Sequence, residues 1–356
     1  MWTDLLITLV KILFVLGVTV GFFAPILTWV ERKQSAIMQD RIGANRADIL
    51  GLRALGLFHI MADGLKMFTK EDFIPQGANP ILHTLSPIIA LIPAILTFAV
   101  VPFGGVYEIF DTRVNLVIAD LDVGLLFVFA IASIATYGYV IAGWSSNNNW
   151  SLLGSMRTSA QMISYEVTMG LTIIGVLMVY GSMKLTDIGA QQEDFLRWGV
   201  FLQPLGFVMF FAASIAENKR IPFDNPEAES ELVAGYFTEY SGLKFGMFFM
   251  AEFIEMVTIA AIVTILFFGA WHIPFISTAT MLSFFDILGS SGANIIVMLI
   301  HVGIFFAKVV IFIWVQMTIR WTLPRFRYDQ IMKLGWKILL PLSLANILVT
   351  GIVIII

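Results

Sequence analysis

Long apolar stretches recur along the whole chain and constrain its fold more than any other feature. A helix needs roughly 20 mostly apolar residues to cross the hydrocarbon core of a membrane, and eight segments approach or exceed that length. They are Leu5–Val30, Leu85–Phe103, Val123–Gly143, Met162–Tyr180, Val200–Ala216, Phe245–Phe268, Ile295–Gln316 and Trp336–Ile356. The chain is 58% hydrophobic, more than a soluble core of this size can bury. We therefore expect an all-α, polytopic membrane protein in which residues 1–356 form one membrane domain with eight transmembrane helices.

Lysine and arginine are distributed very unevenly between the loops on the two sides of this predicted bundle. The loops after the first, third, fifth and seventh segments carry Arg32, Lys33, Arg41, Arg46, Arg53, Lys66, Lys70, Arg157, Lys219, Arg220, Lys244, Arg320, Arg325, Arg327 and Lys333. The opposite loops carry only Arg113, Lys184 and Arg197. Because basic loops stay on the cytoplasmic side, the sequence predicts that both termini lie on the outer, periplasmic side.

The first basic loop contains a second kind of apolar pattern. Apolar residues of this loop recur at helical spacing over positions 49–69, at Leu50, Ala54, Leu57, Phe58, Met61, Leu65 and Phe68. One apolar stripe with charged residues on the other faces is typical of an amphipathic helix. We expect this helix to lie at the inner membrane interface or against the bundle, and a simple interfacial anchor is the alternative.

A second cytoplasmic loop, residues 217–244, is rich in acidic residues although only 13% of the chain is charged. It holds six of the 25 acids, namely Glu217, Asp224, Glu227, Glu229, Glu231 and Glu239. Carboxylates packed together repel one another and bind protons more tightly, so this loop could hold or pass protons. A solvated acidic loop is the alternative, but Phe223, Tyr236, Phe237 and Tyr240 are poorly suited to water.

Ionisable residues inside the predicted spans are costly, which makes each a functional candidate. Glu166 and Glu252 are favoured as proton-binding groups, because a buried carboxyl group beside a water-filled path can exchange protons. Glu255 shares a helix face with Glu252 and is either functional or paired with Lys308 across helices. We expect Lys11 to reach the outer headgroups.

Metal and disulfide chemistry have no support in the sequence. The chain has no cysteine, which excludes disulfides, cysteine-held iron–sulfur clusters and thiolate zinc sites within it. His301 is interpreted as a packed histidine, and His59, His83 and His272 fall at span ends or in loops rather than facing one another. No internal repeat supports an inverted-repeat transporter, and we expect no metal, no catalytic residue and no nucleic-acid partner.

Three stretches resemble one family of membrane subunits of proton-pumping NADH–quinone oxidoreductase, respiratory complex I: the H-type subunit, equivalent to the mitochondrially encoded subunit 1. They are Val30–Lys33 with Gln39–Arg46, Pro222–Gly242, and Leu323–Lys337. The predicted span count agrees with that family. Ala44 and Asn225 depart from the residues usual in the family, and Ala44 is expected to loosen a turn in the first loop.

The resemblance implies a chamber for ubiquinone or menaquinone on the cytoplasmic side, with the quinone as substrate and no covalently bound cofactor. It implies quinone-site roles for Glu31, Arg32, Arg41, Arg46, Asp63, Phe223, Asp224 and Glu227. It implies a proton path through Glu166, Glu217, Glu229, Glu231, Glu239 and Glu252. Implied partners are a peripheral iron–sulfur subunit, small membrane subunits, antiporter-like subunits and membrane lipids, in the inner membrane of a bacterium.

Two other functions remain open. A related membrane subunit of an energy-converting hydrogenase would use the same scaffold without quinone. A free-standing proton or ion transporter is the other. The basic first loop and the intact stretch around Glu227–Gly242 favour the quinone-site subunit over the hydrogenase subunit. The lack of repeats and the large cytoplasmic loops favour a docking subunit over a transporter.

Overall fold

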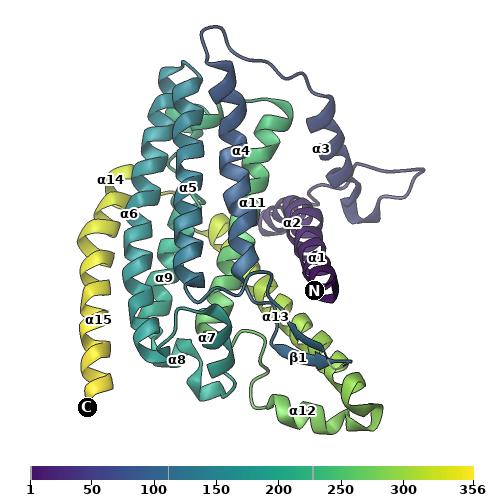
Figure 1. The fold of residues 1–356 in the computed structure, drawn as a ribbon. Coiled ribbons are helices and arrows are strands. Elements are labelled where there is room, and N and C mark those ends of the chain that lie inside the picture. Colours follow the sequence, from purple (N-terminus) through teal and green to yellow (C-terminus); the bar gives the residue numbers. More distant parts are fainter. Residues whose placement is uncertain (1, 111, 227) are drawn as a thin grey trace.

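The computed structural model describes residues 2–110, 112–226 and 228–356, which form a bundle of long helices (Figure 1). The helices are α1 Trp2–Leu16, α2 Ala24–Met38, α3 Phe58–Thr69, α4 Pro80–Thr97, α5 Gly124–Ser145, α6 Asn149–Tyr180, α7 Leu185–Gln191, α8 Gly199–Leu202, α9 Pro204–Glu217, α10 Glu229–Leu232, α11 Gly242–Phe267, α12 Thr278–Phe284, α13 Gly289–Thr322, α14 Tyr328–Lys333 and α15 Leu340–Ile355. Short π-helical turns join α1 to α2 and α14 to α15. Two strands, β1 Val106–Ile109 and β2 Thr112–Asn115, pair antiparallel and were not predicted from the sequence.

Within the described part of the chain, seven helices are long and apolar enough to cross a membrane. They correspond to seven of the eight predicted spans, so the all-α polytopic prediction is confirmed. The predicted fifth span is divided between α8 and α9, which break at Gln203 and Pro204. Because α9 has 14 residues, fewer than the roughly 20 of a full crossing, the count of eight stays a prediction.

Helix α11 occupies the centre of the bundle. It packs against α4 and α13, while α6 packs against α5, α9 and α15. Apolar residues of α11 such as Ile254, Val257 and Leu266 are fully buried, whereas α15 exposes Leu348 and Val353. A helix that is apolar all round needs burial on every side, and α11 satisfies that need with its neighbours.

The two ends of the bundle differ in chemistry. The charged end carries the loops around residues 39–79, 146–148, 218–241 and 323–327, and the other end, here called the hairpin end, carries β1–β2 and α12. In Figure 1 the loop between α3 and α4 lies at the top, and the hairpin, α12 and both termini lie in the lower half. This arrangement gathers the acidic loop and the basic first loop at one end.

A group of phenylalanines fills the bundle between the centre and the hairpin end. Rings from α9, the end of α11 and the middle of α13 touch edge-on or tilted, with centroids 4.7 Å apart for Phe268 and Phe312 and 5.5 Å for Phe207 and Phe267. This phenylalanine layer consists of Phe207, Phe210, Phe211, Phe267, Phe268 and Phe312. Such contacts stabilise a dry core beyond the area they bury.

The amphipathic helix of the first loop is shorter than predicted. It begins at Phe58 rather than near residue 49, because the backbone at Leu50, Ala54 and Leu55 has positive φ. Gly56 also has positive φ, and a Cβ there would lie 2.0 Å from the carbonyl oxygen of Ala44. Apolar spacing alone could not reveal that this segment must turn tightly against residues 44–45 before the helix begins.

Two lysines inside the spans bind backbone carbonyls rather than acids or headgroups. Lys308 Nζ lies 2.7 Å from both Phe268 O and His272 O, just beyond the end of α11, where carbonyls lack intrahelical partners. The suggested pairing of Lys308 with Glu255 is therefore wrong. Lys11 Nζ donates to Val117 O at 3.1 Å, so this ammonium finds its partner within the protein instead of reaching only the headgroups.

We expect Gly154→Ala to destabilise the protein, because α6 and the acidic loop touch through this glycine. A Cβ on Gly154 would lie 2.6 Å from Gly235 Cα and 2.8 Å from Tyr236 N, and backbone atoms cannot move aside cheaply. Overpacking of this kind costs roughly 1–3 kcal/mol. The measurement is the apparent melting temperature of the purified membrane complex, which should fall.

Gly170 provides the matched control because it lies in the same helix with nothing within 4 Å of a Cβ. Gly170→Ala should leave the melting temperature unchanged or raise it, since alanine is favoured over glycine inside a helix by roughly 0.5–1 kcal/mol. Equal melting temperatures for the two variants would contradict the close contact at Gly154.

Candidate functional site

The segment after α9 folds into the charged end of the bundle instead of crossing its surface. Gln161 Nε2 on α6 donates to Ala216 O at 2.7 Å and to Phe223 O at 2.8 Å. The Phe223 ring is buried between Tyr165 and Phe326. The two hydrogen bonds give buried backbone carbonyl groups a partner, and together with the ring contacts they hold residues 218–226 among the helices.

Four charged side chains meet where this segment passes α2, α11 and α13. Arg220 approaches Glu31 at 3.2 Å and Glu252 at 2.7 Å. Arg320 approaches the same two carboxylates at 3.2 Å and 3.8 Å. The side chain of Arg220 is 3% exposed and that of Glu252 is 9% exposed. We call Glu31, Arg220, Glu252 and Arg320 the charge quartet.

The quartet joins residues that the sequence had assigned to two different roles. Glu31 was predicted at the quinone site and Glu252 on the proton path, and Arg220 and Arg320 each contact both. Sequence reasoning missed Arg220 and Arg320 as site residues, because it counted them only as basic loop residues. The available signal was a pair of acids without an obvious cation, Glu31 just after the first predicted span and Glu252 inside the sixth, since buried charges require partners.

Asp224 extends the charged region toward the loop before α14. Its carboxylate accepts a hydrogen bond from Arg325 at 2.8 Å. Burial raises the pKa of Asp224 to about 6, although the guanidinium of Arg325 opposes that rise. Asp224 therefore gains a proton when the pH falls through about 6, which weakens its attraction for Arg325.

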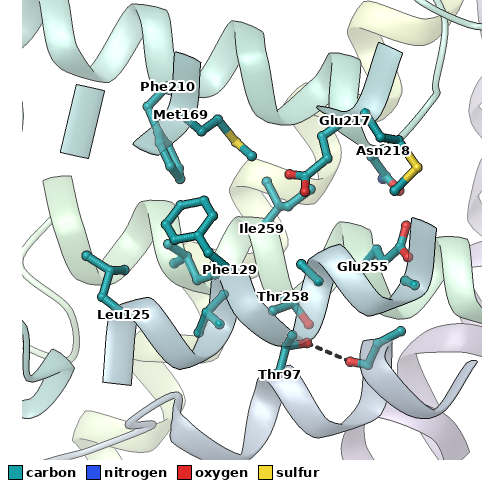
Figure 2. Close-up of a pocket in the computed structure, with 16 residues that line it drawn as sticks. Thr97, Leu125, Phe129, Met169, Phe210, Glu217, Asn218, Glu255, Thr258 and Ile259 are labelled. Atoms are coloured by element: carbon teal, nitrogen blue, oxygen red, sulfur yellow. Dashed lines mark hydrogen bonds between the residues drawn. The ribbon is translucent and has the colours of Figure 1, made fainter. Parts of the chain in front are cut away.

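A cavity lies inside the bundle between α4, α5, α6, α9 and α11, and we call it the inner cavity. It is lined by Ala94, Thr97, Leu125, Val128, Phe129, Ala132, Ala135, Met162, Met169, Phe210, Glu217, Asn218, Glu255, Thr258, Ile259 and Ile262. Figure 2 shows Glu217, Asn218 and Glu255 gathered at one end and Leu125, Phe129 and Phe210 toward the other. Its volume is about 60 Å³, and a water needs on the order of 10–15 Å³ on this measure, so a few waters fit.

Glu255 and a further acid, Glu166, have partners on neighbouring elements. Glu255 is paired with Lys219, with 3.4 Å between Nζ and Oε2, and accepts a hydrogen bond from Tyr139 at 3.2 Å. Glu166 on α6 accepts a hydrogen bond from Ser133 on α5. Glu166 is close enough to influence Glu217 electrostatically. The structure thus places Glu166, Glu217 and Glu255 around one interior region.

A second, larger cavity lies beside the amphipathic helix α3, and we call it the α3 cavity. It has a volume of about 400 Å³ and is lined by Thr28, Arg32, Asp63, Lys66, Met67, Lys70, Ala234, Phe237, Thr238, Tyr240, Ser241, Gly242, Phe245 and Phe249. Asp63 pairs with Arg32 at 2.7 Å and with Lys66 at 3.6 Å. Ligand pockets commonly combine apolar walls with a few fixed polar groups, as this cavity does.

Arg41 and Arg46 differ in how close they lie to these sites. Arg41 borders a neighbouring cavity of about 330 Å³ together with Glu31, Arg32 and Ser35, and it donates to Ser35 Oγ at 3.2 Å. Arg46 is exposed, and its backbone N–H donates to His59 Nε2 at 3.2 Å. The structure therefore brings Arg41, but not the Arg46 side chain, to the α2 end of the site.

The remaining predicted acids lie toward the surface. Glu231 is 47% exposed and pairs with Arg157 at 2.6 Å, and Glu239 accepts a hydrogen bond from Asn148 at 2.6 Å. Glu227 lies outside the described residues, and of Glu229 only the backbone, at the start of α10, is described. Within residues 2–110, 112–226 and 228–356, no three histidines or acids come together as metal ligands.

Comparison with known proteins places this architecture in a family. The model of the family described as NADH dehydrogenase matches residues 10–351. A protein of Geobacter metallireducens, named as an H-type subunit of NADH-quinone oxidoreductase, is 46% identical over 98% of this chain and 96% of its own length. Proteins of Cytophaga hutchinsonii and Flavobacterium johnsoniae with the same kind of name are each 43% identical, over 96% and 97% of this chain and 94% of their own lengths. The chain belongs to the NADH dehydrogenase family that includes the H-type subunits of bacterial NADH-quinone oxidoreductases.

Proposed function

We propose that this chain is the subunit of a membrane-bound NADH–quinone oxidoreductase that admits quinone at its charged end and starts the transfer of protons into the membrane. The α3 cavity is the observation that carries the proposal. It lies between a membrane-length helix, an amphipathic helix and the acidic loop, and its 400 Å³ volume is within the usual range for ligand sites, about 300–1,000 Å³.

The cavity suits an amphipathic quinone in two ways. Phe237, Phe245 and Phe249 provide an apolar wall for the ring and tail. Arg32 and Asp63, which pair at 2.7 Å, provide fixed polar groups for the quinone oxygens. Arg41 and Glu31 continue the polar region, and the Phe223 ring packs on Phe326 in the loop before α14. Asp224 and Glu227 are assigned to the same quinone set, and Arg46, whose side chain is exposed, is assigned to the mouth of the site.

The proton path begins where this region meets the charge quartet. Glu252 lies in the quartet, and Glu255, three residues along α11, faces the inner cavity with Glu217. Glu166 then continues the series toward α5. We assign Glu229, Glu231 and Glu239 to the entrance of the path, at the surface of the acidic loop. A change of charge on reduced quinone would thus act first on the quartet and then on the cavity.

The chain's orientation in the cell follows from the same reasoning. In this multi-pass protein of a bacterial inner membrane, the charged end faces the cytoplasm and the termini face the periplasm, because basic loops stay inside. The exposed apolar residues of the first loop, such as Leu55, Leu65 and Phe68, suit docking against a peripheral iron–sulfur subunit. The helix flanks suit lipids, small membrane subunits and antiporter-like subunits.

Filling the α3 cavity tests the quinone assignment. Met67 lines the cavity, so Met67→Trp should block entry and lower kcat/KM for quinone at least tenfold, which corresponds to about 1.4 kcal/mol. NADH oxidation by an artificial acceptor that does not use the quinone site should persist. The measurement is steady-state quinone reduction by the assembled complex in membranes.

Met67→Leu is the matched control, because it conserves volume and such exchanges cost less than about 1.5 kcal/mol. Its quinone kinetics should stay close to those of the unmodified complex. If Met67→Trp also left KM and inhibitor sensitivity unchanged in a fully assembled complex, quinone would not enter through the α3 cavity.

A further inference from the structure

Lys219 occupies a backbone position that lysine rarely takes. Helix α9 ends at Glu217 with Asn218 as its C-cap, and Lys219 follows with φ of 55°. Helices often end with a residue in this left-handed conformation, but it is usually glycine or asparagine. A strained residue that persists in a fold points to a role for its side chain.

The side chain of Lys219 turns into the bundle. It is fully buried, with 0% of its surface exposed, and its ammonium lies 3.4 Å from Glu255 Oε2. The same ammonium lies 3.8 Å from the centre of the Tyr139 ring. Burial opposes a charged lysine, but the carboxylate of Glu255 and the hydroxyl of Tyr139 outweigh it and raise the pKa of Lys219 above its ordinary value.

The neighbouring cavity is built to hold water. Asn218 is 1% exposed and lines the inner cavity with Glu217 and Glu255. Among the described residues, neither the side-chain oxygen Oδ1 nor the side-chain nitrogen Nδ2 of Asn218 has a hydrogen-bond partner. Buried polar groups in this situation are usually satisfied by water, so water is expected between the two carboxyl groups.

From these contacts we propose that Lys219 is the counter-charge that holds Glu255 as a carboxylate, ready to accept a proton through the water of the inner cavity. The inference deepens the proton path of the proposed function and rests on it. The other titratable groups near Lys219 are Tyr139 on α5, Glu252 on α11 and Glu217 at the end of α9, and Arg220 already pairs with Glu252. Lys219 acts through Glu255 and is therefore a positioning residue.

The proton step conserves charge within the cavity. Glu217, as a carboxylic acid, gives its proton to a cavity water, and that water passes a proton to the Glu255 carboxylate. The O–H bond at Glu217 breaks and an O–H bond at Glu255 forms. One negative charge moves from α11 to α9, and Lys219 then lies beside a neutral Glu255 and is free to turn toward the new carboxylate.

Infrared spectroscopy of the assembled complex tests this assignment without turnover. Lys219→Gln should give one additional protonated carboxylic acid at pH 7, which should shift in deuterium oxide and be absent from the Lys219→Gln, Glu255→Gln double variant. Lys219→Arg, which keeps the charge, should show no new acid. Protons translocated per electron should fall in Lys219→Gln and recover in Lys219→Arg.

Lys244 supplies the control, since it pairs with the half-exposed Asp72 at 3.0 Å elsewhere on α11. Lys244→Gln should add no protonated acid. The assignment is overturned if Lys219→Gln shows no new acid, or if the new acid persists in the double variant. If the Met67 variants showed that quinone does not enter through the α3 cavity, the infrared result for Lys219 would still stand. Failure of the proposed function can therefore be told apart from failure of the inference about Lys219.

Discussion

Arg220→Ala should destabilise the protein more than any other single change considered for the charged end. Arg220 is 3% exposed and contacts Glu31 and Glu252 at 3.2 Å and 2.7 Å, so its removal leaves Arg320 to face two buried carboxylates. Breaking a buried pair in this way costs about 3–5 kcal/mol. We expect little assembled complex in membranes and a clearly lower melting temperature for what remains.

The acidic loop provides a matched exposed pair. Arg157 and Glu231 are closer together, at 2.6 Å, but their side chains are 29% and 47% exposed. Exposed pairs contribute only about 0–1 kcal/mol, so Arg157→Ala should assemble and melt like the unmodified protein. If Arg157→Ala and Arg220→Ala lowered assembly and the melting temperature to a similar extent, burial of the charge quartet would not explain the effect of Arg220→Ala.

Glu217→Gln should abolish most proton translocation while the complex still assembles. Glutamine keeps the shape of the side chain and much of its hydrogen bonding, but it cannot release a proton. Because Glu217 and Glu255 share the inner cavity, the relay loses its donor, and a general acid–base group of this kind contributes roughly 10²–10⁴-fold in rate. The measurement is the number of protons taken up by inverted membrane vesicles for each quinone that is reduced.

Glu108→Gln is the control for that experiment. Glu108 lies in strand β1 with its side chain 69% exposed beside Arg113, at the opposite end of the bundle. Its loss should change neither pumping nor quinone reduction. Unchanged pumping in Glu217→Gln at full assembly would remove the inner cavity from the proton path, whereas lost pumping with full quinone turnover would separate the two functions.

The sequence predicted the membrane architecture well because span length is set by the thickness of the bilayer. It predicted poorly where local backbone geometry decides, as at Gly56, whose positive φ delays the start of α3 until Phe58. It also missed the break between α8 and α9 at Gln203 and Pro204, because the residues on both sides of that break are apolar.

The site was predictable as a set of acids but not as a set of pairs. Spacing placed Glu252 and Glu255 on one helix face, yet nothing in the sequence says that Arg220 pairs with Glu252 and the adjacent Lys219 with Glu255. That division depends on the turn at Lys219, which sends the two side chains to different partners. Likewise Lys308 could be seen as buried, but its carbonyl partners lie in a loop whose path only the fold defines.

The phenylalanine layer bears on how a membrane voltage would act on this bundle. Its rings pack between α9, α11 and α13 toward the hairpin end, and apolar rings polarise less than a region of carboxyl groups and water. We therefore expect more of the voltage to fall across the layer than across the charged end. Moving one charge across a full 100 mV requires about 2.3 kcal/mol, so proton exchange between Glu217 and Glu255, on one side of the layer, should work against only a fraction of that energy.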